Sequence, residues 1–491
     1  MQFRNTGKSR FGVRRVCGLI LVLSVALPGR FSLAADPAPS AEAFEALKKA
    51  QQEMMQQIRA QQEKIDELEH QARAQKLAAI PLPGSAIVEI DAKTAPPAET
   101  NYMPWSDVTV ASQTKIKLYG FARLDAIYDT DRPNNTQTAA YIRSEDPNAP
   151  GTIGAPKHAH DFTMDPRLTR LGADLIAPPM CSLGGPELTG KIEIDFYNNG
   201  LLGQSESREA VRMRHAYLKL KWDDFSLLAG QTWDVISPLY PIVNPDLVMW
   251  GAGNLGDRRP QLRSEWTPEV GPGKVILQGE VGLTGADNNQ SLDPAGTTGA
   301  GFRDGEKSGK PTLQARGAYR TPFVWEKQFL EFGLYVHRAW QQTDTKFNGV
   351  NKFDSLAYGL DLSMPLYTDT IWLKGELWSG KDVDDVRGGI FQGINETTGK
   401  GIRSKGGFVE IGAKLPWWKW YNIHAGYSTD DPNNADLNTG GRAANRTWYI
   451  ANRFYFDPVE IGFDYLRWRT DYIGFLKGQD NRFQMYMSYK F

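Results

Sequence analysis

The sequence predicts an all-β fold, a 16-stranded antiparallel transmembrane β-barrel preceded by an N-terminal α-helical coiled coil. Three observations lead to this prediction. Polar and apolar residues alternate in segments of about ten residues throughout residues 115–491. The connections between these segments alternate between long and short. Residues 40–77 instead repeat every three or four residues, which is typical of a helix.

The clearest alternating segment is residues 481–491. Alternation with a period of two predicts a β-strand with one apolar face, and eleven residues is about the length of a strand that crosses a bilayer. We expect this strand to pair with an earlier one and close the sheet, because open strand edges do not occur in lipid. Phe491 is similar to the terminal aromatic residue that marks bacterial outer-membrane barrels for insertion. The apolar set is Phe483, Met485, Met487, Tyr489 and Phe491, and it alternates with Gln484, Tyr486, Ser488 and Lys490.

The composition excludes a bundle of transmembrane helices. Hydrophobic residues make up 41% of the chain and the mean hydropathy is −0.45. Beyond the N-terminus, no apolar run reaches the roughly 18 residues that a transmembrane helix needs. A transmembrane barrel can be this polar because only alternate residues face lipid. The 14 Trp, 19 Tyr and 22 Phe suit the aromatic girdles of such a barrel.

Residues 1–35 are predicted to be a secretory signal peptide. Five basic residues precede the apolar run 16–27, and residues 32–35 offer a small-residue cleavage site. The mature chain would keep one cysteine, Cys181, which excludes an intramolecular disulfide and a multi-cysteine metal site. Its net charge would be −7, because the signal peptide contains six basic residues and no acidic ones. This charge argues against a general nucleic-acid binder.

Residues 40–77 are predicted to form a periplasmic coiled coil, followed by a Pro/Ala-rich linker at 78–113. Ile58 and Ile65 at a positions favour two strands, although Gln51 and Gln61 weaken that preference. A solvated single helix is the alternative. The seam comprises Phe44, Leu47, Gln51, Met54, Ile58, Gln61, Ile65, Leu68 and Ala72.

Sixteen strands are expected from residue 115 onward, and their connections are of two sizes. The connections after odd-numbered strands are mostly long, whereas those after even-numbered strands are mostly short; 178–186 is the longest exception. An even strand count with long connections at one end is typical of an outer-membrane barrel, whereas a soluble sandwich has no reason to place them so. The expected strands are 115–129, 167–177, 187–198, 211–222, 225–237, 261–268, 273–285, 310–321, 328–340, 354–364, 370–379, 406–415, 419–428, 446–456, 459–469 and 481–491.

The alternation also assigns the two faces of each strand. In segment 187–198, Ile192 and Ile194 oppose Glu193 and Asp195. A charged residue on the lipid face near the bilayer midplane costs roughly 2–4 kcal/mol for Arg or Lys. The charged faces are therefore expected to point inward. Sixteen strands enclose an interior too wide for wall side chains alone to fill, which implies an aqueous lumen.

Several segments resemble the DcaP-like outer-membrane porins, and the resemblance spans most of residues 115–491. It implies a homotrimer in the Gram-negative outer membrane, in contact with lipid and lipopolysaccharide, that passes small anionic solutes such as dicarboxylates. It also implies a periplasmic position for the N-terminal extension. We expect the trimer of this family although the coiled-coil seam leans toward two strands. The matching segments are 118–128 (LYGFARLDAIY), 167–174 (RLTRLGAD), 212–219 (RMRHAYLK), 228–234 (LAGQTWD) and 253–261 (GNLGDRRPQ).

The connection 238–260 is the candidate for a loop that folds into the lumen. It is unusually apolar for a loop that faces water, so we expect it to pack on the inner wall; a contact between subunits is the alternative. A pore selects by its width and by the charges at its narrowest point. The candidate pore-lining residues are arginines at the end of this loop or inward by alternation: Arg170, Arg258, Arg259, Arg263, Arg316 and Arg453.

Two pairs of arginines do not fit the alternation. Arg212 and Arg214 share their parity with apolar residues, as do Arg467 and Arg469. Each pair would face lipid unless it lies beyond the membrane or follows a β-bulge, which exchanges the two faces of a strand.

Two other classes of function remain open at this point. A barrel-embedded enzyme would need a nucleophile and a base close together, and no Ser–His–acid pattern is evident in the sequence. The pair His158 and His160 is weak evidence for a metal, and we expect no metal site and no cofactor. A structural anchor, tethered to peptidoglycan through the N-terminal helix, is the second alternative. Conductance in planar bilayers separates both from a porin.

Overall fold

The computed structural model describes residues 108–109, 114–149, 157–178, 183–197, 210–243, 248–285, 307–324 and 328–491. The predicted signal peptide, the coiled coil at 40–77, most of the linker and Cys181 lie outside these residues. Residues 102–491 form one compact unit. In it, the short strand β1 (Val108–Thr109) precedes the barrel and pairs with the start of β2.

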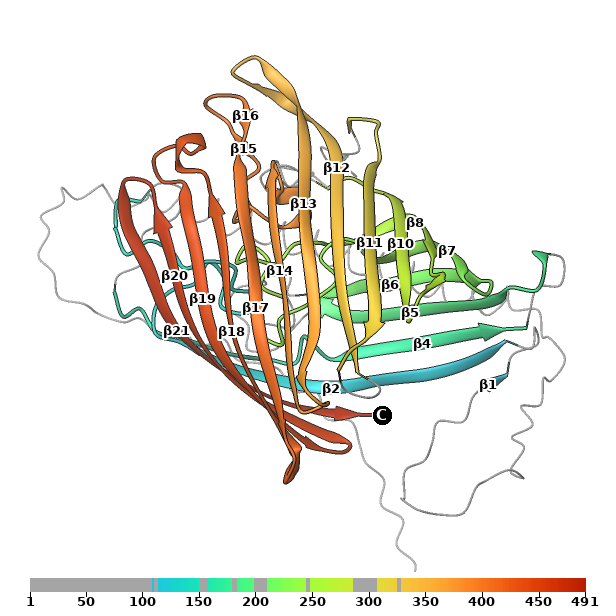
Figure 1. Cartoon of the computed structure of the whole chain (residues 1–491). Coiled ribbons are helices and arrows are strands. Elements are labelled where there is room, and N and C mark those ends of the chain that lie inside the picture. Colours follow the sequence, from blue (N-terminus) through green and yellow to red (C-terminus); the bar gives the residue numbers. More distant parts are fainter. Residues whose placement is uncertain are drawn as a thin grey trace, which may run out of the picture. The chain divides into compact units, whose positions relative to one another are not determined.

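The described strands form a closed antiparallel barrel with a wall of sixteen strand positions, as predicted (Figure 1). Two positions are each shared by two strands: β3 (Asp161–Asp165) and β4 both pair with β2, and β9 (Glu269–Val270) and β8 both pair with β10. The principal wall strands are β2 (Lys115–Asp129), β4 (Arg170–Ala177), β5 (Glu187–Tyr197), β6 (Ala210–Lys221), β7 (Phe225–Trp233), β8 (Arg258–Trp266), β10 (Gly273–Gly282), β11 (Thr312–Pro322), β12 (Phe329–Phe347), β13 (Val350–Tyr367), β14 (Ile371–Lys381), β17 (Arg403–Leu415), β18 (Trp418–Pro432), β19 (Arg442–Phe456), β20 (Val459–Tyr472) and β21 (Phe475–Lys490).

The barrel closes where the last strand pairs with the first long strand. The register of β21 on β2 runs from Lys490 opposite Phe121 to Arg482 opposite Asp129, and Figure 1 shows the two strands side by side. The terminal Phe491 continues this pairing, because its amide donates to the carbonyl oxygen of Gly120 at 3.1 Å. A Cβ atom at Gly120 would lie 2.7 Å from the Phe491 ring, so the glycine makes room for the terminal aromatic side chain.

Exposure along the strands shows which face points outward. On β21, Met485 and Met487 are exposed, whereas Tyr486, which lies between them, and Arg482, which has the same parity as Tyr486, are buried. The same pattern holds on β5, where Ile192 is exposed and Asp195 is fully buried. The apolar face is therefore the outer face and the charged face points inward, as the alternation predicted. Among the described residues, none of the helical segments is long and apolar enough to span a membrane.

The predicted strand boundaries were wrong at the end of the barrel that carries the long connections. Strands β12 and β13 extend to a tight turn at Asn348–Gly349, and β20 and β21 meet at Ile473–Gly474, where longer connections were expected. The β12–β13 hairpin projects beyond its neighbours (Figure 1). These extensions carry polar residues on both faces, so no lipid-facing pattern reveals them in the sequence.

Candidate functional site

The connection between β7 and β8, residues 234–257, lies inside the barrel. Its backbone amides donate to carboxylates of the opposite wall: Leu239 to Glu376 on β14 at 2.7 Å, and Ile242 to Glu410 on β17 at 2.8 Å. The wall also donates to the connection: the indole N–H of Trp378 on β14 donates to the carbonyl oxygen of Gly253 at 2.7 Å. The described part of this lumen loop therefore packs on the inner wall, as its apolar composition predicted, and not on another subunit. Residues 244–247 of the loop lie outside the described residues.

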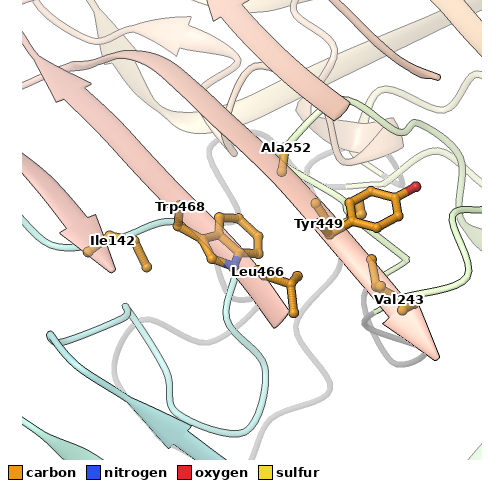
Figure 2. Packing of buried hydrophobic residues seen from close by; sticks show 8 residues of the cluster. Ile142, Val243, Ala252, Tyr449, Leu466 and Trp468 are labelled. Atoms are coloured by element: carbon orange, nitrogen blue, oxygen red, sulfur yellow. The ribbon is translucent and has the colours of Figure 1, made fainter. Parts of the chain in front are cut away.

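Apolar side chains attach the lumen loop to β19 and β20. Val243 and Ala252 of the loop pack against Leu466 and Trp468, and all four are fully buried (Figure 2). Ile142, from the connection between β2 and β3, joins the same cluster. An apolar patch on the inward face of these two strands thus holds the two connections in place.

Two further connections fold inward, which the sequence interpretation missed. Residues 130–149 lie on the inner face of β19–β21, where the Asn445 amide donates to the Ala140 carbonyl oxygen at 2.7 Å. Residues 382–402, with the 3₁₀ turn η3 (Asp384–Val386) and the hairpin β15 (Ile394–Asn395) and β16 (Lys400–Gly401), bury Val383 and Val386 against Leu255 of the lumen loop. Both connections carry apolar residues, so the argument applied to the lumen loop would have identified them.

Gly253 marks the closest approach of the lumen loop to the wall. Its φ of +127° favours glycine, and a Cβ atom there would lie 2.4 Å from the Gly407 carbonyl oxygen of β17. Side-chain-bearing residues of the lumen loop, Val248 and Met249, also have positive φ angles. Such strained conformations persist only where the surrounding contacts fix them. The contacts of Val248, Met249 and Gly253 therefore fix this part of the lumen loop against the wall.

Arg259, predicted to line the pore, anchors the base of the lumen loop. It is 4% exposed, and its guanidinium donates to Asp234 at 2.7 and 3.1 Å. It also donates to the carbonyl oxygens of Leu283 at 2.8 Å and Asp385 at 3.1 Å. The Asp385 carboxylate lies 3.0 Å from Nε2 of His337 on β12. One buried ionic network thus joins the lumen loop, the 382–402 connection and the wall.

This network is expected to survive mild acid. Burial raises the pKa of the Asp385 carboxyl group, but His337 and Arg259 outweigh burial and bring that pKa to about 2. A carboxylate with a depressed folded-state pKa stabilises the fold fully above its unfolded pKa of about 4, and the stabilisation is lost as the pH falls through the folded value. Asp385 should therefore contribute no gating step to the single-channel conductance between neutral pH and about pH 4. A gating step between about pH 6 and pH 5 that Asp385→Asn abolishes would contradict this assignment.

Two other predicted arginines are also buried in ion pairs. Arg316 on β11 donates to Asp361 at 2.6 and 2.9 Å and to Glu331 at 2.7 Å. Arg453 on β19 pairs with Asp464 and donates to the Ile242 carbonyl oxygen at 2.8 Å. Their side chains are 4% and 2% exposed. Both stabilise the half of the barrel that the inward connections cover.

The remaining predicted arginines keep contact with the lumen. Arg170 on β4 is 23% exposed and lies 3.5 Å from Glu193. Arg263 on β8 is 17% exposed, donates to Gln261 at 2.9 Å and lies 3.9 Å from Glu280. Among the described residues, the inward connections pack mainly on β10–β21 and on one end of β2, so the more open part of the inner wall lies along β2–β8. These accessible arginines all lie on that part.

Arg258 differs from its neighbour Arg259. Alternation along β8 turns it away from Arg259, and its guanidinium stacks on the Trp233 ring, 4.5 Å from the ring centroid. Trp233 in turn contacts Tyr240 and Trp250 of the lumen loop, with centroids 4.9 and 5.9 Å apart, which places the stack inside the barrel. Among the described residues, no carboxylate forms a salt bridge with Arg258, and its Nη1 atom has no hydrogen-bond partner.

A β-bulge adds two arginines to the same part of the wall. The register between β5 and β6 shifts between Glu193 and Ile194, and this shift turns Arg212 and Arg214 inward. Arg212 donates to Asp195 at 2.7 and 2.8 Å, and Arg214 bridges Glu193 and Asp195 at 2.8 and 2.6 Å. Both repel the charge of Arg258. The bulge alternative proposed from the sequence is therefore correct for this pair, although the sequence alone could not choose it.

The local charge balance favours an anion. Three guanidinium groups, those of Arg170, Arg212 and Arg214, share two carboxylates, Glu193 and Asp195, and Arg258, which has no salt bridge within the described residues, adds a fourth positive charge nearby. We name these four arginines together with Arg263 the arginine wall. Arg214 is buried, so it contributes its charge but not a contact with the solute. The chemistry available there is charge-assisted hydrogen bonding to a passing anion.

No catalytic arrangement is evident in the described part of the chain. Ser355 and Asp385 both approach the same nitrogen of His337, at 3.2 and 3.0 Å, so the histidine cannot relay a proton between them. All three are fully buried. His424 pairs with Glu410 at 3.1 Å. Within the described ranges, His, Cys, Asp and Glu side chains form no group of three that could hold a metal ion.

Comparisons with known proteins identify the fold. No family model matches the chain, and no curated protein is similar to it in sequence. The crystal structure of the outer membrane channel DcaP of Acinetobacter baumannii is similar, with a TM-score of 0.57, 18% identity and coverage of 77% of this chain and 97% of that one. The resemblance expected from the sequence motifs is confirmed for the fold.

Two other solved structures are more distant. Pseudomonas putida OprB has a TM-score of 0.48 with 9% identity over 76% of this chain and 94% of that one. The anion-selective porin from Comamonas acidovorans has a TM-score of 0.47 with 12% identity over 77% of this chain and 100% of that one. Of the three, only DcaP is similar enough to support an argument about the fold.

Proposed function

We propose that this chain is an outer-membrane porin whose channel passes small anionic solutes along the arginine wall. The observation that carries the proposal is the excess of guanidinium groups over carboxylates on the part of the inner wall that the described inward connections cover least. Arg258 contributes most to this excess, because it has no salt bridge to a carboxylate within the described residues. The fold shared with an outer membrane channel supports the location and the class of function.

The arrangement suits passage rather than tight binding. A pore must attract its solute at the entrance and release it at the exit, so several weak sites are better than one strong site. Arg170 and Arg212 are each partly offset by a carboxylate, and Arg263 is offset by a carboxylate at a longer distance. A dicarboxylate could exchange one guanidinium contact for the next along this row. Trp233 at the end of β7 and Tyr240 of the lumen loop lie beside Arg258 and would limit the width.

The buried arginines take a different part in the proposed function. Arg259, Arg316 and Arg453 would shape the passage by holding the lumen loop and the wall in place, and each is paired with at least one carboxylate. Their proposed role is therefore structural, and they would not contact the solute.

Assembly and location complete the proposal. We propose a homotrimer in the outer membrane with lipid and lipopolysaccharide around it, inserted by recognition of the strand that ends at Phe491. The N-terminal residues would act as a cleaved signal peptide, a periplasmic coiled coil at 40–77 and a linker, with peptidoglycan as a partner of the helix. A tether or a barrel-embedded enzyme would not require an open lumen. Single-channel conductance of the purified protein therefore tests the class of function, and its ion selectivity tests the arginine wall.

A further inference from the structure

Three arginines lie on the outer face of the barrel near the ends of β19 and β20. Arg467 and Arg469 alternate with Leu466, Trp468 and Thr470, which are fully buried on the inner face. The register of β20 on both neighbouring strands is continuous from Val459 to Thr470, so no bulge turns the two arginines inward. Both side chains therefore face outward, on the same side of β20 as its apolar residues, as the alternation in the sequence indicated. Arg446 of β19 lies directly opposite Arg469 on the same face.

An aromatic row places these arginines relative to the membrane. Trp448 contacts Tyr465, and Tyr465 contacts Phe483, with ring centroids 5.3 and 5.1 Å apart on three adjacent strands. At the other end of β19, Phe454 and Phe456 stack on Trp420 with centroids 6.0 and 5.5 Å apart. Such rows occupy the two interfaces of a membrane.

The spacing of the two rows fits the thickness of a membrane. The eight residue-to-residue steps from Trp448 to Phe456 span about 27 Å along the strand. A tilt of about 40° reduces this to roughly 20 Å across the membrane, close to the apolar band of an outer-membrane barrel. Trp448 belongs to the first of these rows, and Arg467 is its cross-strand partner. Arg446 and Arg469 lie farther along the strands, on the side of the first row away from the second. The three guanidinium groups are therefore at the level of the lipid headgroups.

The charges of these arginines are not balanced by the protein. Like charges directly opposite each other on two strands are destabilising, and Arg446 faces Arg469. They share one carboxylate, that of Asp471, at 2.5 and 2.9 Å. In the described part of the chain, Arg467 has no carboxylate partner. Three cations and one anion thus meet on a surface where a charge facing lipid is unfavourable.

We propose that Arg446, Arg467 and Arg469 bind the phosphate groups of an outer-leaflet lipid, with its acyl chains packed on the aromatic row. Guanidinium groups match phosphate oxygens in two-point geometry, and the side chains of Arg446 and Arg469 are 41% and 46% exposed. The same phosphate would relieve the repulsion between these two residues. The inference rests on the proposed membrane location but not on the selectivity of the channel.

The test compares the full-length protein with a variant in which the three arginines are replaced by glutamine. Binding of diphosphorylated lipid A and of its dephosphorylated form to the detergent-solubilised protein is measured by native mass spectrometry and by the shift in Tm. The triple variant should bind the diphosphorylated lipid at least about tenfold more weakly, because each basic residue at a membrane surface contributes to binding an anionic lipid. The dephosphorylated lipid should bind both proteins equally.

The charge control replaces Lys117, Lys221 and Lys419 by glutamine, which removes the same charge at the opposite end of the barrel and, for Lys117 and Lys221, on its inner face. This control should bind the diphosphorylated lipid as the unmodified protein does. Equal binding by the arginine variant, or an equal loss in the control, would overturn the proposal. So would stabilisation by inorganic phosphate alone at the same level as the lipid. A change in subunit number with unchanged lipid binding would show a subunit contact instead. Unchanged conductance in the variant would separate this result from any failure of the channel proposal.

Discussion

Replacing Arg258 by glutamine should shift the reversal potential of the channel toward cations while the conductance stays similar. The guanidinium stacks on Trp233 inside the barrel and forms no salt bridge to a carboxylate in the described part of the chain, so its charge acts on the passing ion. A unit charge about 4 Å from an ion in a water-like medium contributes roughly 1 kcal/mol, or about a fivefold change in local anion occupancy. The measurement is the reversal potential under a salt gradient in planar bilayers.

Lys405 provides the control for this variant. It lies on the outside of β17 with its side chain 73% exposed, and Lys405→Gln removes the same charge far from the arginine wall. That control should keep the original reversal potential. If Arg258→Gln also keeps it, Arg258 does not line the path of the ion, and the arrangement of Trp233, Tyr240 and Arg258 is not the selective part of the channel.

Replacing Arg259, the adjacent residue, should have a different and structural effect. Arg259→Gln leaves the buried carboxylate of Asp234 without its main cation and removes a second cation from Asp385, and breaking a buried ion pair on one side costs roughly 3–5 kcal/mol. The base of the lumen loop should detach from the wall. We expect a larger and noisier single-channel conductance, together with faster cleavage of the lumen loop by an added protease.

A second variant separates the loop from the barrel as the origin of that effect. Arg259→Gln combined with Asp234→Asn removes the unpaired charge next to Arg259 and should recover part of the original conductance, because neutral side chains leave a smaller desolvation penalty. A noisy conductance that is identical in both variants would show that Asp234 is not the partner that matters. An unchanged conductance in Arg259→Gln would show that the ionic network does not hold the lumen loop.

The barrel could be predicted from the sequence because lipid imposes a regular pattern. Segment 481–491 alternates so strictly that its face and its closing position follow, and β21 has these properties in the structure, although it begins earlier, at Phe475. The inward position of Glu193 and Asp195 follows from the same reasoning. Beyond the lipid no such pattern is imposed, and the β12–β13 hairpin was therefore predicted too short.

The site was less predictable, since its geometry depends on contacts distant in sequence. Arg258 and Arg259 are neighbours in the chain, yet one stacks on an aromatic ring and the other is buried among carboxylates from two connections. The bulge that turns Arg212 inward is a single extra residue in β6, and nothing in its sequence marks the position. Alternation alone gave the correct outward face for Arg467 and Arg469.

The central claim is that the open part of the inner wall attracts anions. The most direct test is the reversal potential of the unmodified, purified protein in a planar bilayer that separates two concentrations of potassium chloride. A channel lined by the arginine wall should give a reversal potential shifted toward the equilibrium potential of chloride. Added dicarboxylate should reduce the chloride current. A reversal potential of the sign set by potassium, or an absence of conductance, would contradict the account.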